Sequence, residues 1–233
     1  MPFVYSFLPN ALQRLIWIPT RLLFFFFIHL KIRGATELKR IPRGVIFAVN
    51  HSGELDSLIV PAALPFFSTH LPMFYTSREK SFYKRSGWRQ SFYGGTFFKL
   101  WGAYPVRVGT HNYEESLSRH VEFLRDGRSI CIFPEGGTTP DGNLRPAKGG
   151  IAYLAWRTGS PIIPVRISNI WKLGFRGFIS RKRNVTISFG NALFTKELFE
   201  FCKGVPVVNE ERDDFKQAAQ RVMEEIRSLT RSS

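Results

Sequence analysis

Residues 44–56 read Gly-Val-Ile-Phe-Ala-Val-Asn-His-Ser-Gly-Glu-Leu-Asp, an apolar run that ends in a polar turn. A short continuous apolar run rich in β-branched and aromatic residues is typical of a buried strand. Residues 55–64 follow with a helical pattern that contains Pro61. Alternating strands and helices are typical of α/β domains, in which helices cover the faces of a sheet. This stretch therefore predicts an α/β fold.

The rest of the chain repeats this alternation of short apolar runs with helical or turn-rich segments. Further strands are expected at residues 73–77, 102–108, 129–134, 161–168 and 185–190, and helices at 113–125 and 151–156. Near the C-terminus, apolar residues recur every three or four positions and predict one amphipathic helix that packs on the domain. These residues are Phe215, Ala218, Ala219, Val222, Met223, Ile226 and Leu229. The pattern predicts a mixed central sheet flanked by helices.

The N-terminal stretch Leu15–Leu30 is apolar and rich in phenylalanine. Pro19 and Arg21 break it, and the uncharged run from Leu22 has nine residues, against about 20 for a helix that spans a bilayer. We therefore expect residues 1–34 to form a helical segment at a membrane interface, and residues 35–233 to form the main domain with its C-terminal helix. Two alternatives stay open: a helix buried against the core, and a pair of short helices that dip into one leaflet.

The charge of the chain is one-sided. Its 233 residues contain 33 Lys and Arg against 18 Asp and Glu, a formal net charge of +15. Residues 142–196 carry ten basic side chains and no acidic one. Such a field attracts phosphorylated substrates, acidic lipid head groups or nucleic acid, although a merely solvated basic surface stays an alternative. The two cysteines, Cys131 and Cys202, lie far apart, which favours a reducing compartment over a disulfide framework.

The first candidate site is the turn after the strand of residues 44–50. It places His51 five residues before Asp56, with Glu54 between them. A turn that enters a helix can return the Asp56 carboxylate to one imidazole nitrogen, which leaves the other nitrogen to accept a substrate proton. A histidine in a turn is more often structural, so this spacing alone is weak evidence. The chain lacks the usual glycine-rich nucleotide-binding, nucleophile-elbow and zinc-protease motifs.

The second candidate site is the glycine-rich turn after the strand of residues 129–134. It reads Phe-Pro-Glu-Gly-Gly-Thr-Thr over residues 133–139, and Arg145 and Lys148 follow soon after. Exposed backbone N–H groups with nearby cations suit a phosphate, and Arg107, at the end of another expected strand, would add a further cation. An ordinary loop is the alternative for the Glu-Gly-Gly sequence by itself.

Together these segments resemble the glycerophospholipid acyltransferases of the lysophosphatidate type. The resemblance covers about residues 45–170 and consists of four ordered blocks. These are the His-x-x-x-x-Asp of residues 51–56, Gly-Ala-Tyr-Pro-Val-Arg at 102–107, Phe-Pro-Glu-Gly at 133–136 and Pro-Ile-Ile-Pro-Val at 161–165. Four blocks in the right order are far more specific than any one of them.

The resemblance implies a role for each matching residue. His51 would be the general base and Asp56 its orienting partner, while Arg107, Glu135 and Gly136 would bind the glycerol phosphate of the acceptor. Pro164 would shape the acyl-donor site, and Lys148 is a candidate phosphate ligand. Two departures stand out. The family often continues its third block with Thr-Arg-Ser, where this chain has Gly-Thr-Thr at 137–139, and Pro105 stands in the second block.

The resemblance implies transfer of a fatty acyl group from acyl-CoA or acyl carrier protein to the free hydroxyl of 1-acyl-glycerol-3-phosphate, giving phosphatidic acid. No metal or redox cofactor is expected. The expected partners are membrane lipids, a lysophospholipid acceptor and the thioester donor, without nucleic acid, at the cytoplasmic face of a membrane as a peripheral or monotopic protein. Acylation of a different lysolipid stays open, as does a non-enzymatic protein that binds anionic membranes or nucleic acid.

Overall fold

The computed structural model describes residues 4–77, 96–106, 112–200 and 211–229. Its centre is a seven-stranded sheet with the order β1-β7-β6-β2-β5-β3-β4. The strands are β1 (Lys31–Arg33), β2 (Ile46–Val49), β3 (Met73–Ser77), β4 (Ala103–Pro105), β5 (Ser129–Ile132), β6 (Ile162–Ser168) and β7 (Thr186–Phe189). Neighbouring strands are parallel except for β6 and β7, which are antiparallel. The predicted mixed central sheet is confirmed.

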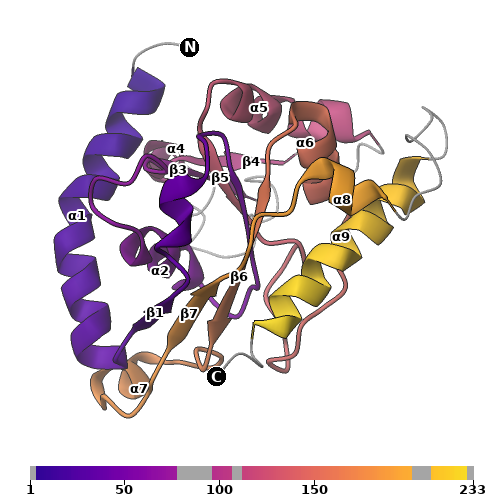
Figure 1. The fold of residues 1–233 in the computed structure, drawn as a ribbon. Coiled ribbons are helices and arrows are strands. Elements are labelled where there is room, and N and C mark those ends of the chain that lie inside the picture. Colours follow the sequence, from indigo (N-terminus) through magenta and orange to yellow (C-terminus); the bar gives the residue numbers. More distant parts are fainter. Residues whose placement is uncertain (1–3, 78–95, 107–111, 201–210, 230–233) are drawn as a thin grey trace.

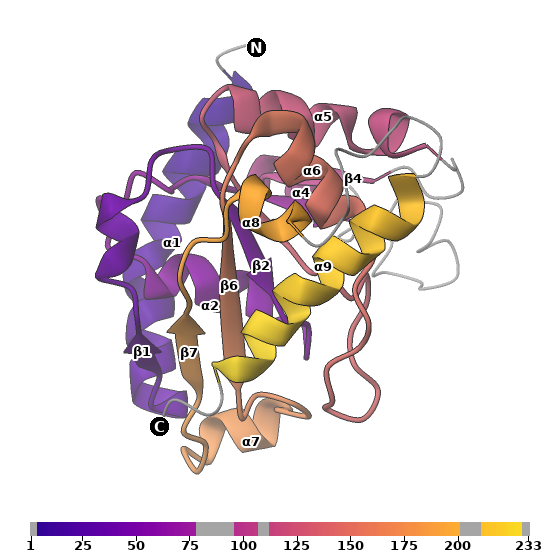
Figure 2. The same cartoon turned by 45° about the vertical axis from the view of Figure 1, so that its right-hand side comes forward.

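Helices cover both faces of this sheet (Figures 1 and 2). They are α1 (Val4–Ile28), α2 (Asp56–Ala63), α4 (Thr96–Trp101), α5 (Tyr113–Arg125), α6 (Gly150–Thr158), α7 (Phe175–Ile179), α8 (Thr195–Phe199) and α9 (Glu211–Ser228), with a 3-10 turn at Glu37–Arg40. Helices α1, α2 and α4 lie on one face, whereas α5, α6, α8 and α9 lie on the other (Figure 1). The C-terminal helix packs on the domain, as its apolar stripe predicts.

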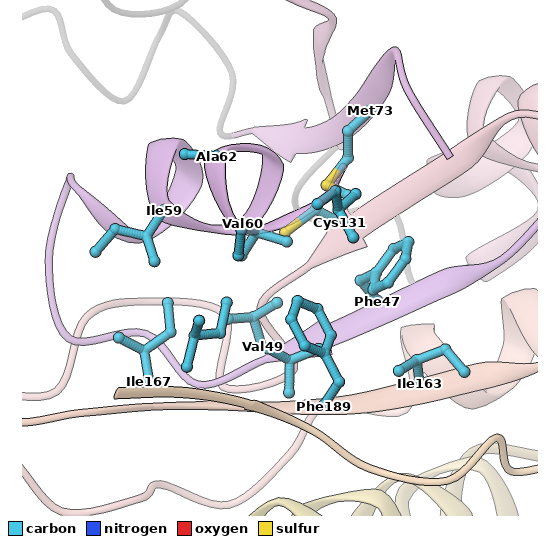
Figure 3. Close-up of a cluster of buried hydrophobic side chains, with 14 of the residues drawn as sticks. Phe47, Val49, Ile59, Val60, Ala62, Met73, Cys131, Ile163, Ile167 and Phe189 are labelled. Atoms are coloured by element: carbon cyan, nitrogen blue, oxygen red, sulfur yellow. The ribbon is translucent and has the colours of Figure 1, made fainter. Parts of the chain in front are cut away.

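Two buried clusters fill the space between the sheet and its helices. On the α2 face, Ile59 and Val60 lie against Phe47 and Val49 of β2, and Phe189 joins them from β7 (Figure 3). On the other face, apolar residues of α5, α6 and α9 enclose the remaining side of β2 and β5. Both faces of β2 are therefore buried, which explains its uninterrupted apolar sequence.

Local signals account for several element boundaries. Helix α5 begins after Asn112, whose side chain accepts a hydrogen bond from the Glu114 N–H, and it ends at the Asp-Gly sequence of residues 126–127. Helix α6 ends at Gly159, which has the left-handed φ of 70° that glycine adopts readily. The strand expected at 102–108 is assigned over Ala103–Pro105, and its residues from 107 onward lie outside the described part of the chain.

The N-terminal segment is helical, as predicted. Pro19 interrupts its apolar sequence but does not end the helix, because α1 continues through both Pro9 and Pro19 for 25 residues. A proline in a helix interior costs about 3 kcal/mol, and contacts of the inner helix face offset that cost here. By length and composition alone, residues Phe7–Ile28 of this helix are enough to cross a membrane. Of this apolar stretch, 17% is buried inside the protein. The consecutive phenylalanines of α1 differ in exposure: Phe24 is buried, whereas Phe25 and Phe26 are exposed.

Polar side chains on the inner face of α1 tie it to the sheet and to α2. The buried Gln13 donates to the Met73 and Trp101 carbonyls at 2.7 and 2.9 Å and accepts from the Met73 N–H at 2.8 Å. Trp17 and Arg21 donate to the Leu64 carbonyl at the end of α2, each at 3.1 Å. The helix is thus packed on residues beyond position 34, and the division of the chain at that position stays a prediction.

A buried histidine on α5 makes the stability of the fold sensitive to acid. Burial lowers the pKa of His120 from its ordinary 6.5 to about 4. The unfolded chain therefore binds more protons between these values, so stability falls as the pH drops through this window. From pH 7 to pH 5 we expect a loss of about 2 kcal/mol in the free energy of unfolding.

Urea unfolding at both pH values measures this loss. In the variant His120→Leu the difference between the two pH values should shrink. It should not vanish, because burial also lowers the pKa of His70. An undiminished pH dependence in that variant would contradict the assignment to His120.

Candidate active site

The candidate site lies where three adjacent parallel strands end. Strands β6, β2 and β5 are neighbours in the sheet and run in the same direction, so their carboxyl ends meet at one edge. His51 follows β2, the glycine-rich turn follows β5, and the segment that leads to α7 follows β6. Ligand sites of open α/β sheets form at this edge.

His51 forms a hydrogen-bonded pair with the buried Asp56. The Nδ1 atom of His51 lies 3.0 Å from Oδ2 of Asp56, and the carboxylate side chain is fully buried while the imidazole is 21% exposed. The same carboxylate oxygen accepts the backbone N–H groups of Ser52 and Gly53 at 2.6 and 2.9 Å. The turn therefore returns the Asp56 side chain to His51, which is the geometry that their spacing suggests.

This pairing fixes the protonation pattern of the imidazole. A carboxylate only accepts hydrogen bonds, so Nδ1 carries the proton that it donates to Asp56, and Nε2 is left as an acceptor. The ring of Phe133 stacks on the imidazole, with centroids 4.0 Å apart and an angle of 17° between the planes. Stacking on one side and the carboxylate at Nδ1 together hold the ring in one orientation.

Glu135 ties the two turns together through backbone groups. Its Oε1 accepts the His51 N–H and its Oε2 accepts the Arg145 N–H, both at 2.9 Å, and the residue is 2% exposed. Burial raises the pKa of this carboxyl above its ordinary value, while the two N–H groups act in the opposite direction. Glu135 thus positions the backbone of the candidate base, and both of its oxygens are occupied by this task.

Replacing Glu135 with glutamine should separate this positioning from charge. The amide keeps one acceptor oxygen and places an NH₂ group against the second backbone N–H, which leaves a buried donor unpaired. We expect the free energy of unfolding to fall by about 1–3 kcal/mol. Urea titration measures the loss, and the exposed variant Glu122→Gln on α5 is the control. Equal midpoints for the two variants would contradict this role.

Gly136 and Lys148 meet in the same loop. Gly136 has a φ of +69°, and a Cβ atom added there would lie 2.9 Å from the Lys148 Nζ atom. The loop is closed by hydrogen bonds from the Lys148 N–H to the Pro134 carbonyl and from the Thr139 N–H to the His51 carbonyl, both at 2.8 Å. The side chain of Lys148 therefore lies across the glycine turn, beside Gly136.

The remaining predicted residues lie elsewhere. Pro164 pairs with Ala48 in the sheet, three positions before His51, and lines a cavity of about 350 Å³ with residues of β7 and α9. Arg107 lies outside the described residues. Within the part of the chain that is described, no three His, Cys, Asp or Glu side chains gather as metal ligands would. The structure thus brings His51, Asp56, Glu135, Gly136 and Lys148 together, with Pro164 apart.

Two supporting residues were missed from the sequence. Asn50 is buried, donates to the Ile167 carbonyl at 3.0 Å and accepts the Ile167 N–H at 2.7 Å, which fixes β6 beside the His51 turn. Phe133 provides the stacking surface for the imidazole. Their position in the sequence could have identified them, because Asn50 directly precedes His51 and Phe133 directly precedes the Pro-Glu-Gly turn, each at the end of a strand.

The fold and the paired residues at its edge define an α/β protein with a buried His–Asp dyad. The family model described as Acyltransferase matches residues 29–168, which is more than half of the sequence. The chain belongs to this acyltransferase family.

Curated relatives match shorter regions. A chloroplast 1-acyl-sn-glycerol-3-phosphate acyltransferase of Brassica napus is 31% identical over 80 residues, 34% of this chain and 23% of that protein. One from Borreliella burgdorferi is 43% identical over 49 residues, 21% of this chain and 20% of that protein. A lyso-ornithine lipid O-acyltransferase of Pseudomonas aeruginosa is 28% identical over 138 residues, 59% of this chain and 47% of that protein. The chain spans less than half the length of these relatives.

A solved structure resembles the whole fold. The 1-acyl-sn-glycerophosphate acyltransferase PlsC from Thermotoga maritima superposes with a TM-score of 0.61 at 18% identity, over 95% of this chain and 81% of that one. At this level of identity the likeness concerns the fold, and it agrees with the α/β arrangement described above.

Proposed function

We propose that this protein is an O-acyltransferase that moves a fatty acyl group from a thioester donor to the free hydroxyl of 1-acyl-glycerol-3-phosphate, giving phosphatidic acid. The observation that carries the proposal is the contact between His51 Nδ1 and the buried Asp56 Oδ2, which leaves Nε2 as a base. Family membership and relatives named for this reaction support it. The donor is acyl-CoA or acyl carrier protein, both of which carry the same thioester.

The proposed reaction is a direct transfer. His51 Nε2 accepts the proton of the acceptor hydroxyl as its oxygen attacks the thioester carbonyl carbon. The tetrahedral intermediate then collapses, the carbon–sulfur bond breaks, and the imidazolium returns the proton to the departing thiolate. Asp56 stabilises the imidazolium while it exists, since its carboxylate lies at Nδ1. No oxidation state changes, so we expect no redox cofactor, and proton transfer by such a base contributes about 10²–10⁴-fold.

Basic groups beside the dyad support a phosphorylated acceptor. Lys148 lies across the glycine turn and Arg145 follows it, so two cations flank the loop that is bound to the His51 backbone. We propose that Gly136 and Lys148 contact the glycerol phosphate, with Glu135 holding the turn, and that Arg107 adds a cation. Pro164 is proposed to shape the donor site through the cavity that it lines.

Release of free thiol tests this function. The purified protein in detergent is mixed with a long-chain acyl-CoA, or with an acyl carrier protein thioester, with and without lysophosphatidate. We expect release that depends on the acceptor, together with phosphatidic acid as product. Absence of release with both donors over several lysolipids would overturn the enzymatic assignment and favour a protein that only binds anionic membranes.

A second acceptor class has a specific observation in its favour. Thr138 stands where the family often has an arginine, and one relative is named for acylation of a lyso-ornithine lipid. Parallel assays with lysophosphatidate and a lyso-ornithine lipid decide between the two acceptors, because the second lacks a phosphate monoester. Preference for the second would replace phosphatidic acid as the proposed product.

We also propose that the protein binds the cytoplasmic face of a membrane through α1 and α7. Helix α7 is fixed to the end of α1, because Phe178 stacks on Phe27 at 5.1 Å and the Arg181 Nε donates to the Phe26 carbonyl at 3.1 Å. Figure 2 shows α7 at the end of the sheet where β6 leads into it. Phe175 and Ile179 of α7 are 79% and 48% exposed and extend the exposed apolar face of α1. Basic residues are concentrated in the same stretch of sequence, namely Lys172, Arg176, Arg181, Lys182 and Arg183.

Flotation with vesicles tests this surface. We expect the protein to float with vesicles that contain phosphatidylglycerol, and less with neutral vesicles, since the basic side chains add electrostatic attraction. The double variant Phe175→Ser with Ile179→Ser should float less, whereas Phe194→Ser, an exposed phenylalanine before α8, should float normally. Equal flotation of all three proteins would contradict the role of α7.

A further inference from the structure

Arg166 is a charged residue in an otherwise apolar strand next to the candidate base. It belongs to β6, between Val165 and Ile167, whose side chains lie in the core on the α2 face. Side chains alternate along a strand, so Arg166 projects from the opposite face, on which α9 packs. The two hydrogen bonds between Asn50 and the Ile167 backbone hold this part of β6 beside the residue that precedes His51.

Two nitrogens of the Arg166 guanidinium lack a hydrogen-bond partner among the described residues. The residue is half-buried, and its Nε and Nη1 atoms are enclosed without a hydrogen-bond acceptor among the described residues. Within the same residues, no carboxylate lies within ion-pair distance of it. Burial lowers the pKa of the guanidinium, the Glu135 carboxylate raises it, and Arg227 lowers it. Enclosing a cation without a partner is unfavourable, so this arrangement suits a site whose anion comes from a ligand.

The surroundings of Arg166 identify the class of anion. The oxygens of Glu135 each accept one backbone N–H group, and this carboxylate attracts Arg166 without lying within ion-pair distance of it. Lys148 lies on the same loop, across Gly136. A guanidinium and an ammonium near one turn match the oxygens of a phosphate monoester, since the planar fork of arginine bonds two of them at once.

We propose that Arg166 binds the phosphate monoester of the lysolipid acceptor and selects for it, in place of the arginine that the family often carries at the position of Thr138. This inference rests on the proposed acyl transfer, and it adds a specificity residue from the fourth block to that reaction. The cation then reaches the phosphate from β6, on the strand adjacent to His51, instead of from the loop after β5.

Two acceptors that differ only in the phosphate test this role. Thiol release is measured with 1-oleoyl-lysophosphatidate and with 1-oleoylglycerol for the wild type, Arg166→Gln, Arg166→Lys and the exposed control Arg125→Gln at the end of α5. For Arg166→Gln we expect the KM for lysophosphatidate to rise about 10–100-fold with the KM for 1-oleoylglycerol unchanged. Arg166→Lys keeps the charge and loses the planar fork, so its KM for lysophosphatidate should lie between those of the wild type and Arg166→Gln.

Equal changes for both acceptors, or none for either, would overturn the proposal, because a structural role of Arg166 would not distinguish them. If Arg166→Gln does not fold, Arg166→Lys decides by the same comparison. Calorimetric measurement of glycerol 3-phosphate binding tests the anion site independently of acyl transfer. Where the wild type releases no thiol, the acyl transfer fails, and weaker glycerol 3-phosphate binding by the Arg166 variants still supports the anion site. Equal binding by wild type and variants contradicts it.

Discussion

Alanine at position 51 is expected to lower acyl transfer by about 10²–10⁴-fold without unfolding the protein. The imidazole is the only side chain of the described site that pairs with a buried carboxylate while keeping a nitrogen free to accept a proton. Its loss removes the base and the stacking on Phe133, but the backbone N–H of residue 51 still reaches Glu135. Thiol release measures the rate, and thermal unfolding checks the fold.

Added imidazole sharpens this test. A free imidazole that enters the vacated volume should restore part of the rate in His51→Ala, and it should leave the wild type unchanged. A folded His51→Ala protein that turns over at the wild-type rate would remove His51 from the role of base and leave the dyad a structural one.

Asparagine at position 56 should lower the rate by about 10²–10⁴-fold, because the imidazolium loses the negative charge that stabilises it. Oδ2 of Asp56 accepts three hydrogen bonds, from the imidazole and from the N–H groups of Ser52 and Gly53. An amide oxygen in the same place keeps all three bonds, and the NH₂ group takes the place of Oδ1, which has no hydrogen-bond partner among the described residues. The substitution therefore removes the charge and keeps the orientation of the ring.

The tautomer is directly observable and separates charge from orientation. Nitrogen NMR of His51 should show the proton on Nδ1 in both the wild type and Asp56→Asn, although kcat falls in the variant. Asp126→Asn, at the exposed end of α5, removes the same charge far from the site and should leave both the tautomer and kcat unchanged. A wild-type rate in Asp56→Asn would show that the carboxylate charge is dispensable.

The parts of the fold that the sequence predicted are those stabilised by local signals. The helix at 113–125 has an asparagine cap and a glycine stop, and the strand at 73–77 is a compact apolar run, so both boundaries match. The continuation of α1 through Pro19 could not be predicted, because the hydrogen bonds that hold this helix in place come from distant residues, such as the bond from Gln13 to Met73. The three-residue β1 and the five-residue α7 have too few positions to show a period.

The candidate site divides in the same way. His51 and Asp56 are five residues apart, so a turn is enough to suggest their contact. The partners of Glu135 could not be predicted, because its bond to the His51 N–H depends on β2 and β5 being neighbours in the sheet. Arg166 was likewise overlooked, since an arginine in an apolar run gives no sign of the face on which it projects.

The bond from the His51 N–H to Glu135 joins residues 84 positions apart in the sequence. It has a consequence for exchange of segments between relatives. If residues 50–56 are replaced by the turn of another family member, the new backbone comes from a protein with a different third block. Its N–H group at position 51 then reaches the Glu135 carboxylate only if both turns keep the same height above the sheet. The first and third blocks are therefore expected to function when transferred as a pair and to fail when transferred singly, so that chimeras of this family should be cut outside residues 50–145 instead of between the blocks.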